Sequence, residues 1–345
     1  MLAVFLEDRV KLTQKDLPMP ECDDGGAVVK VEACGICRTD MKCYYRGQRD
    51  LSLPRVLGHE IAGILLAGGD MASGLEPGSH VQVYPGLSCG QCRFCRRGFD
   101  NMCENLKIIG FNCDGGFSGY LKIPPRGVEA GIIQPIPPGL SFAEASMTEP
   151  IACCLNMLEN LELKPGESLV IFGAGRFGLL TAMLARMQVV TRIIFIEPDE
   201  KRKAFAAGLG FKQCFDPRAP NLQAEIEAFT GGCGADAAVT CSPVPEAFAS
   251  ALQLLAPRGR LGFFSGLVGL ENQGIDLNLV HYKELTIKGA YGCSLRHNNA
   301  ALALLGAGEI DVSSLITKEI ALSELREGLL MVKDQSEISV VVTQF

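Results

Sequence analysis

Residues 168–180, SLVIFGAGRFGLL, decide the fold of the central part of the chain. The apolar run SLVIF is typical of a buried strand, and it leads directly into Gly173, Gly175 and Gly178 in G-x-G-x-x-G spacing, followed by a helical segment. Glycines so placed permit a tight turn, close approach of a pyrophosphate and close packing of helix on strand, while the helix N-terminus supplies N–H donors. The spacing alone is weak evidence, but its position between strand and helix predicts a dinucleotide-binding turn.

The stretch from about 150 to 290 repeats this alternation of apolar strand and helix. Such alternation is typical of a parallel sheet with crossover helices, so we expect a doubly wound parallel sheet here. The segments that carry the pattern are SLVIF, FGLLTAMLARM, RIIFIE, EKRKAFAAG, ADAAVTCS and GRLGFFSG.

The strand RIIFIE ends at Glu197, nineteen residues after Gly178. An acidic side chain at this distance binds the adenosine ribose hydroxyls in dinucleotide-binding folds. A solvent-facing carboxylate at a strand end is the alternative, and the glycines favour the ribose role. Because a carboxylate repels a 2′-phosphate, the sequence favours NAD over NADP.

The residues before about 149 have a different texture, rich in Gly and Pro with short apolar runs such as AVVKVEA, EIAGILLA, HVQVYPG and GYLKIP. These predict strands joined by turns, in a β-rich unit. The tail predicts a helix near residues 298–306 and a last strand at 339–343. Since 345 residues exceed the usual size of one hydrophobic core, two domains are expected.

Composition excludes several classes of protein. A net charge of −7 argues against a nucleic-acid or membrane-surface binder, and no uncharged apolar run is long enough to cross a bilayer. The N-terminal MLAVFLEDRV has no basic leader and is a poor signal peptide. An odd count of 15 cysteines suits a reducing compartment, so we expect a cytoplasmic protein.

Four cysteines lie within the fifteen residues CGQCRFCRRGFDNMC. Two successive C-x2-C steps are metal-chelate spacing without a packing rationale, although chance clustering is the alternative in so cysteine-rich a chain. Four thiolates fill every position around one zinc ion, which predicts a closed, structural site. Its ligands would be Cys89, Cys92, Cys95 and Cys103.

A second set of metal-ligand types is dispersed. Cys37 lies in EACGICRTD, His59 and Glu60 lie in VLGHEIAG, and Glu149 lies in TEPIAC. Singly, each has an ordinary structural explanation: a small buried hydrophobe, a hydrogen-bonded core histidine, a carboxylate at a helix N-terminus. Catalytic zinc ligands are nevertheless often far apart in sequence.

Taken together, these motifs resemble the zinc-dependent medium-chain dehydrogenases. CGICRTD, GHE, the four-cysteine segment, DGGFSGY, TEP and GAGRFG occur here in the order typical of that family. The resemblance spans essentially the whole chain. It implies a Rossmann coenzyme domain at 150–290, and a β-rich GroES-like catalytic domain with two zinc sites at 1–149 and 291–345.

The resemblance also implies the catalytic zinc ligands. Cys37 and His59 would bind the ion, with Glu149 at the position of the remaining protein ligand. Glu60 would join or exchange as a ligand, and the open position is left to water or substrate. Many alcohol dehydrogenases use a Cys2His set. The glutamate at 149 is more similar to the sorbitol-dehydrogenase branch.

The resemblance also implies supporting roles for the residues that follow Cys37. Asp40 would orient the ligating histidine, Thr39 would relay the substrate proton and Arg38 would reach the cofactor pyrophosphate. Lys42 stands where many members carry a histidine that ends the proton relay. A lysine could serve there if its pKa were lowered, but an exposed ammonium is the simpler expectation, so the outward proton path is left open.

Coenzyme contacts are expected along the central domain. The strand end in ELTIKGAYG, residues 284–292, would border the nicotinamide. The expected contacts are Arg38, Gly173, Gly175, Arg176, Phe177, Gly178, Glu197, Arg202, Ser265 and Ala290. Five further residues could shape the substrate pocket, although packing or surface roles are favoured for them: Tyr44, Tyr45, Arg46, Arg49 and Arg296.

The resemblance implies a zinc-dependent, NAD-linked dehydrogenase with two Zn²⁺ per chain, acting on CH–OH donors. The expected reaction is oxidation of a secondary alcohol, polyol or sugar-derived, to a ketone by hydride transfer. An L-threonine 3-dehydrogenase-like or polyol-phosphate dehydrogenase activity stays open. A zinc-less reductase is disfavoured by the retained ligands, and a non-catalytic nucleotide-binding sensor or scaffold by Thr39 and Asp40.

Assembly is expected to follow the family too. Members are commonly homodimers or homotetramers that join coenzyme-domain sheets edge to edge, and GRLGFFSGLVGL, residues 259–270, could supply such an edge. An ordinary buried strand is the alternative. Dimer and tetramer are not distinguished.

Overall fold

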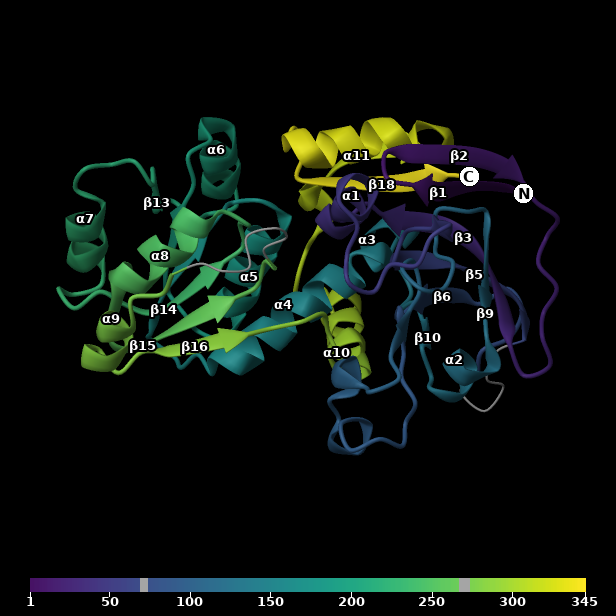
Figure 1. Cartoon of the computed structure of the whole chain (residues 1–345), viewed down its shortest axis with the longest axis horizontal. Helices are drawn as coiled ribbons and strands as arrows, with labels where there is room; N and C mark the ends of the chain where they lie inside the picture. Colours follow the sequence, from purple (N-terminus) through teal and green to yellow (C-terminus); the bar gives the residue numbers. More distant parts are fainter. Residues whose placement is uncertain (69–73, 267–273) are drawn as a thin grey trace. The chain divides into compact units, whose positions relative to one another are not determined.

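The computed structural model describes residues 1–68, 74–266 and 274–345 (Figure 1). These residues form two compact units. One consists of Met1–Ala152 with Cys293–Phe345, and the other of Cys153–Gly292. Within the described residues, no helix combines the length and the apolar composition that spanning a bilayer requires.

The second unit is built on a parallel sheet. Its described strands follow the order β13-β12-β11-β14-β15-β16, and every neighbouring pair is parallel. All five residues of β11 are buried, as expected of a strand covered by helices on both faces. Its elements are β11 Ser168–Phe172, α5 Arg176–Met187, β12 Arg192–Ile196, α6 Glu200–Gly208, β13 Cys214–Phe215, α7 Leu222–Phe229, β14 Ala235–Thr240, α8 Pro245–Leu254, β15 Leu255–Phe263, α9 Leu277–Tyr282 and β16 Thr286–Gly289.

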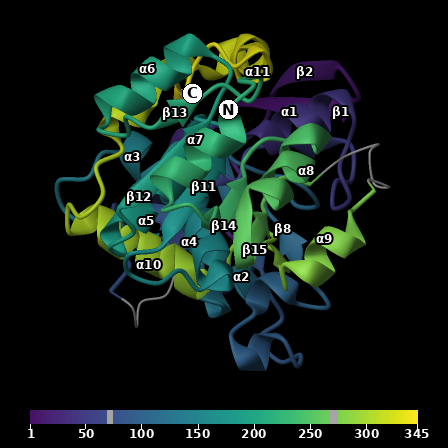
Figure 2. The same cartoon turned by 90° about the vertical axis from the view of Figure 1, so that its left-hand side faces the viewer.

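Helices pack on both faces of this sheet. Apolar side chains of α7, α8 and α9 form one core with β11, β12, β14 and β15. Figure 2 shows the ribbons of these helices and strands. On β15, a Cβ at Gly262 would lie 2.5 Å from the sulfur of Met157 in α4 (Thr148–Leu161), so this helix packs directly on the strand. The chain order reverses at β11, which has β12 on one side and β14 on the other. Open α/β sheets bind their ligands at such a switch point.

The segment 259–270, which was expected as a possible sheet edge, does not provide one in its described residues. GRLGFFSG contributes to β15, which pairs with β14 and with β16 and is therefore internal. Residues 267–270 of the predicted segment lie outside the described residues. Among the described strands of this sheet, two pair on one side only: β13 and β16, the second of which comes from ELTIKGAYG. Composition cannot separate an apolar internal strand from an apolar edge strand, because both faces of a parallel sheet are covered.

The first unit is β-rich. Its main sheet has the order β10-β6-β5-β3-β18-β17 in the described chain, with β9 also pairing β3, and a smaller sheet has the order β2-β1-β4. The strands are β1 Leu2–Asp8, β2 Lys11–Asp16, β3 Ala27–Gly35, β4 Arg55–Val56, β5 Glu60–Gly68, β6 His80–Val83, β7 Gly86–Leu87, β8 Lys107–Ile108, β9 Tyr120–Ile123, β10 Ile133–Pro135, β17 Ile316–Ala321 and β18 Ser339–Gln344. The helices are α1 Arg38–Tyr45, α2 Pro125–Glu129, α3 Phe142–Ser146, α10 Leu295–Gly306 and α11 Leu325–Asp334, with the start of α4.

One strand pair positions the chemistry of this unit. β3 and β5 are antiparallel, and Gly35 at the end of β3 lies opposite Glu60 at the start of β5. A Cβ at Gly35 would come within 2.0 Å of a Glu60 carboxylate oxygen, so only glycine leaves room for that side chain. The chain continues from Gly35 into α1, and this brings the CGICRTD and GHE motifs together.

Candidate active site and zinc sites

The four cysteines of the segment 89–103 converge, although they lie on loops and two short 3-10 turns, η2 (Cys95–Arg97) and η3 (Asp100–Met102). Their four sulfurs all lie within 4.8 Å of one another. The Cys92 and Cys95 sulfurs are 3.5 Å apart, and those of Cys89 and Cys95 are 4.0 Å apart. Tetrahedral zinc with Zn–S bonds of about 2.3 Å places its sulfurs roughly 3.8 Å apart, so this geometry fits a zinc ion.

Backbone donors favour thiolates in this four-cysteine lobe. The N–H groups of Cys89 and Asn105 donate to the sulfur of Cys103, at 3.2 and 3.4 Å. Hydrogen bonds from the backbone of Cys95 and Glu104 lower the pKa of Cys92 to about 6. Burial nevertheless raises the pKa of Cys103 and, together with the Cys92 side chain, raises that of Cys95 to about 12. Zinc binds the thiolate form, so metal binding would release protons from these two thiols.

Three of the four dispersed metal-ligand candidates also lie close together. Cys37, His59 and Glu60 are all buried, and each offers a ligand atom within 4.8 Å of the others. Cys37 is the N-cap of α1, and the histidine immediately precedes β5. A sulfur, an imidazole nitrogen and a carboxylate oxygen in mutual reach are a donor set that zinc accepts.

Asp40 supports this group from behind. It is fully buried, its carboxylate accepts a hydrogen bond from the backbone N–H of Cys37 at 2.8 Å, and it lies 3.4 Å from Nδ1 of His59. Burial alone lowers the pKa of His59, but the carboxylate and the Cys37 thiol more than offset it, so the pKa lies well above its usual range. With a proton on Nδ1, facing Asp40, the ring would offer Nε2 to a metal ion.

Glu149 belongs to a different group. It is buried near the start of α4, and among the described residues it is not part of the group of Cys37, His59 and Glu60. Within its own unit it offers a carboxylate oxygen within 4.8 Å of the sulfur of Cys293. Its role as a zinc ligand stays a prediction.

The glycine-rich turn in the second unit has the backbone conformation and close packing expected of a dinucleotide-binding turn. Gly173 has φ +103°, a backbone conformation that favours glycine. A Cβ at Gly178 would lie 1.9 Å from the Gly173 carbonyl oxygen, so the third glycine is needed for close packing of α5 on the turn. Gly175 is the N-cap of α5, which leaves the N–H groups of that helix terminus available to an anion.

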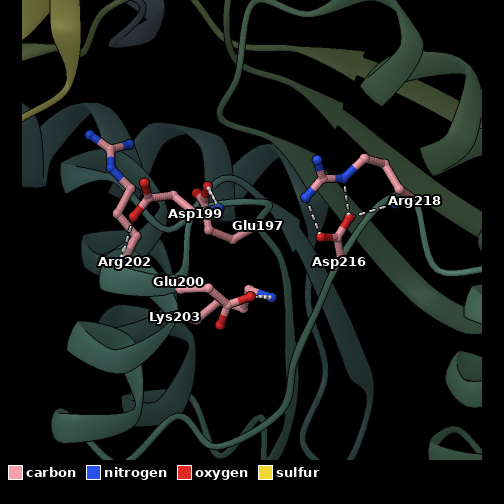
Figure 3. A network of polar contacts seen from close by, with 7 residues as sticks. All are labelled: Glu197, Asp199, Glu200, Arg202, Lys203, Asp216 and Arg218. Atoms are coloured by element: carbon pink, nitrogen blue, oxygen red, sulfur yellow. Dashed lines mark hydrogen bonds and ion pairs between the residues drawn. The ribbon is translucent and has the colours of Figure 1, made fainter.

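Glu197 follows β12 directly beside this turn and is 5% exposed. One carboxylate oxygen accepts from the backbone N–H of Ala174 at 2.7 Å, and the other from the N–H of Asp199 at 3.0 Å. The carboxylate therefore lies in a fixed orientation beside the glycine-rich turn. Figure 3 shows it with the charged residues of the neighbouring loop and helix.

Two family models match the chain at these sites. The alcohol dehydrogenase GroES-like domain matches residues 23–131, and the zinc-binding dehydrogenase model matches residues 177–324. An uncharacterised zinc-type alcohol dehydrogenase-like protein of Haemophilus influenzae is 32% identical over 337 residues, 97% of this chain and 96% of that protein. The chain belongs to the zinc-containing medium-chain alcohol dehydrogenase family. It is accordingly a zinc-dependent, NAD(P)-linked dehydrogenase of the alcohol or polyol type.

Other relatives in this family carry named activities. L-threonine 3-dehydrogenase of Pyrococcus furiosus is 31% identical, over 89% of this chain and 87% of that protein. L-galactonate-5-dehydrogenase of Escherichia coli is 30% identical, over 91% and 89%. The crystal structure of a protein described as a zinc-binding dehydrogenase of Sinorhizobium meliloti 1021, bound to NADP, is 30% identical with a TM-score of 0.89, covering 99% of this chain and 98% of that one.

The remaining predicted coenzyme contacts lie in the second unit of this dehydrogenase. Arg38 is the exception, because it is the first residue of α1 in the first unit. Arg176 is 7% exposed, and its guanidinium carbon lies 5.3 Å from the ring centre of Phe177. The guanidinium of Arg202 would come within 3.1 Å of a Cβ at Gly175, which places it beside the turn. Ser265 follows the end of β15. Ala290 follows β16, and its N–H donates to the carbonyl of Phe263 at 3.3 Å.

The predicted exposure of Lys42 is wrong. Its side chain is only partly exposed on α1, and burial lowers its pKa below the usual range. The expectation of an exposed ammonium rested on the general behaviour of lysine on a short helix. The packing around α1, which includes contacts with α11, was not visible in the motif.

The pocket candidates divide by exposure. Tyr44 is a packing residue, 3% exposed, whose hydroxyl donates to the carbonyl of Val10 at 3.3 Å. The ring of Tyr45 lies under the ammonium of Lys333 of α11, 4.9 Å from its centre. The three arginine candidates are exposed: Arg46, Arg49 and Arg296.

Cys293 is the residue that the sequence interpretation missed. It is 5% exposed and lies close to Glu149, although 144 positions separate them in the chain. Its position directly after the strand segment ELTIKGAYG was the available signal. As an isolated cysteine without chelate spacing it was indistinguishable from a core residue.

Proposed function

We propose that the protein oxidises a secondary alcohol of a polyol or sugar-derived compound to a ketone, with NAD as hydride acceptor. The observation that carries this proposal is the buried group of Cys37, His59 and Glu60 with Asp40 behind it. Three ligand atoms within 4.8 Å leave a position for substrate, unlike the closed four-cysteine lobe. A scaffold without turnover would have no use for an open site of this kind.

In this proposal Cys37 and His59 hold the catalytic zinc, with Glu60 and Glu149 as carboxylate ligands available to it. A zinc ion bound there supplies Lewis-acid chemistry that lowers the pKa of an alcohol hydroxyl. Cys89, Cys92, Cys95 and Cys103 hold the second zinc, and its role is structural.

In this proposal Asp40 orients the imidazole ring of His59, and Thr39 carries the proton of the substrate hydroxyl. Asp40 acts on the ring through its charge, 3.4 Å from Nδ1, and its carboxylate accepts a hydrogen bond from the backbone N–H of Cys37. Thr39 is only partly buried, and its hydroxyl oxygen lies 3.7 Å from the Cys37 sulfur. That hydroxyl accepts the proton that leaves the substrate oxygen and passes it outward.

The substrate class is supported by the named relatives and by the donor set. The names L-galactonate-5-dehydrogenase and L-threonine 3-dehydrogenase each specify a carbon that bears a secondary hydroxyl. A glutamate at 149 gives a harder, more anionic set than a second cysteine would. A threonine-type amino alcohol is the second candidate, since the threonine enzyme is among these relatives.

NAD is favoured over NADP by the charges around Glu197. Its fixed carboxylate would repel a 2′-phosphate. Two nearby cations are engaged by carboxylates: Lys203 pairs with Glu200 at 2.7 Å, and Arg218 makes a two-point contact with Asp216 (Figure 3). The NADP bound to the Sinorhizobium meliloti protein makes this a point for direct measurement.

We extend the proposal to domains, assembly and location. Residues 1–149 and 291–345 would form the catalytic domain with both zinc sites, and 150–290 the NAD-binding domain. Homodimers or homotetramers would form with β16 as the pairing edge, supported by the exposure of Ile287 at 37%. Reduced thiols at both zinc sites suit a cytoplasmic protein.

The proposal is tested by metal analysis of the purified protein together with a coenzyme-reduction screen. The substrates are L-galactonate, L-threonine, sorbitol, a polyol phosphate and 2,3-butanediol, each with NAD and with NADP. We expect two zinc ions per chain and turnover with NAD on a polyol or sugar acid. One zinc and no turnover would contradict the mechanism. Faster turnover with NADP would contradict only the coenzyme assignment.

A further inference from the structure

Asp100 lies inside the four-cysteine lobe but directs its side chain out of it. It is the first residue of η3, and its backbone carbonyl accepts from the N–H of Cys103 at 3.0 Å. Its carboxylate accepts from the backbone N–H of Leu295, 195 positions later, at 3.0 Å. Leu295 is the first residue of α10, where the helix dipole favours a negative charge. The lobe is thereby attached to the start of a helix outside it.

Tyr84 makes a second link at the same place. Its hydroxyl lies 2.6 Å from the carbonyl oxygen of Cys293 and 3.2 Å from the Asp100 carboxylate. One hydroxyl proton faces two acceptors, and the shorter distance favours the Cys293 carbonyl. The tyrosine is 3% exposed, and a Cβ at Gly86 would lie 2.6 Å from its hydroxyl oxygen, so the ring is closely held.

Cys293 connects this network to the catalytic side. Its carbonyl accepts from Tyr84, and its sulfur lies within 4.8 Å of a Glu149 carboxylate oxygen. Both Cys293 and Glu149 are buried, at 5% and 7% exposure. Close packing leaves little freedom to adjust one without the other. The hydrogen bonds of Asp100 and Tyr84 and the approach of the Cys293 sulfur to Glu149 therefore connect a predicted ligand of the structural site to a predicted ligand of the catalytic site.

We propose that Asp100 and Tyr84 are positioning residues that hold the segment Cys293–Leu295, and with it the surroundings of Glu149, in register with the four-cysteine lobe. This inference rests on the proposed function, because it takes Glu149 as part of the catalytic site. It gives the lobe a second role: the lobe fixes the geometry of the site that binds substrate.

The test uses full-length protein in which Co²⁺ replaces zinc at both sites. The four thiolates make the lobe the main source of the sulfur charge-transfer intensity. Because cobalt in the lobe also absorbs in the visible region, the d–d bands of the catalytic cobalt are read as the difference between the doubly substituted protein and protein with cobalt in the lobe alone. In Asp100→Ala we expect the catalytic bands to shift while the charge-transfer bands persist, with kcat/KM of the zinc enzyme lower by roughly 10-fold. Asp100→Asn keeps an oxygen for the Leu295 N–H and is expected to restore most of both.

Tyr84→Phe is the second variant, because it leaves every lobe residue in place. It removes the hydrogen bond to Cys293 and is expected to shift the same d–d bands. Glu104→Gln is the matched control, because it changes only a lobe side chain that pairs at the surface with Arg93 at 3.3 Å and leaves the Glu104 backbone hydrogen bond to Cys92 in place. Its spectrum and rate are expected to equal those of the wild type.

The outcomes separate this inference from the proposed function. Wild-type d–d bands in both Asp100→Ala and Tyr84→Phe would overturn it. Loss of the charge-transfer bands in Asp100→Ala, with a wild-type spectrum in Tyr84→Phe, would also overturn it, by showing that Asp100 acts within the lobe alone. Absence of any dehydrogenase turnover in the wild type would contradict the proposed function, while the spectral comparison would still decide the positioning role.

Discussion

The two candidate metal sites of the first unit are built in opposite ways. The four-cysteine lobe takes all its ligands from residues 89–103, on loops and single 3-10 turns. The open site takes Cys37 from the start of a helix and His59 and Glu60 from the start of a strand, brought together by β3–β5 pairing. The lobe's four cysteines lie outside any strand or α-helix, so we expect a metal bound there to contribute folding energy. The open site is held by the sheet, so its metal is free to serve chemistry.

Removal of a ligand from the open site gives the largest expected effect. Cys37→Ala should lower turnover by roughly 10³-fold or more, because the ligand set that polarises the substrate oxygen is incomplete. The midpoint of thermal unfolding should change by only a few degrees, since β3, β5 and α1 remain. Coenzyme reduction and calorimetry measure the two quantities. A large fall in the unfolding midpoint would show that this site, too, supports the fold.

Removal of a ligand from the lobe should give the reverse pattern. Cys92→Ala is expected to destabilise the protein by several kcal/mol and to lower the unfolding midpoint by about 10 °C, because a structural site's binding energy is folding energy. A chelator should lower the midpoint of the wild type similarly. If Cys92→Ala lost catalysis with unchanged melting behaviour, the division of labour between the two sites would be wrong.

Asp40→Asn tests how the open site is held without removing a ligand. An amide keeps an oxygen for the Cys37 N–H but no longer stabilises a proton on His59 Nδ1 through charge. We expect a roughly 10- to 100-fold loss in zinc affinity or turnover. Asp114→Asn is the control, since Asp114 is an exposed carboxylate of the same unit that pairs with Arg55 at 2.8 Å. Equal losses in the two variants would mean that Asp40 acts only as a structural anchor.

The same contrast explains what the sequence could predict. C-x2-C spacing confines four sulfurs to one loop whatever the rest of the chain does, and the glycine-rich turn is likewise local, so both could be interpreted from spacing. The parallel sheet and the family assignment are confirmed. The dispersed ligands needed the order of motifs along the whole chain.

The features that the sequence predicted wrongly or missed depend on packing between distant segments of the chain. The neighbourhood of Cys293 and Glu149 exists only after the chain has returned from the coenzyme-binding residues, and no spacing rule spans 144 positions. The edge role of β16 rather than β15 depends on strand order, and the partial burial of Lys42 depends on the packing of α1.

Substitution of Lys42 gives the smallest expected effect. It tests whether a partly buried charge beside the open site lowers the free energy of unfolding. Burial lowers its pKa, so the folded state releases this proton at a lower pH than the unfolded state does. Since the unfolded state then binds more protons, the charged lysine destabilises the fold at neutral pH, and stability recovers as pH rises toward the unfolded value of about 10.4. Lys42→Met should therefore stabilise the protein at pH 7, by no more than about 0.5 kcal/mol, and this gain should shrink by pH 10.

The matched control for Lys42→Met is Lys30→Met, on β3 of the same unit. A hydrogen bond and the charge of Glu32 raise the pKa of Lys30, so its removal should not stabilise the protein at pH 7. Thermal unfolding of both variants at pH 7 and pH 10 measures the difference. A gain for Lys42→Met that is the same at both pH values would show that side-chain packing, and not the buried charge, is the cause. A pH-dependent gain would instead show that the open site retains a destabilising charge, in contrast to the lobe, whose ligands stabilise the fold when metal binds.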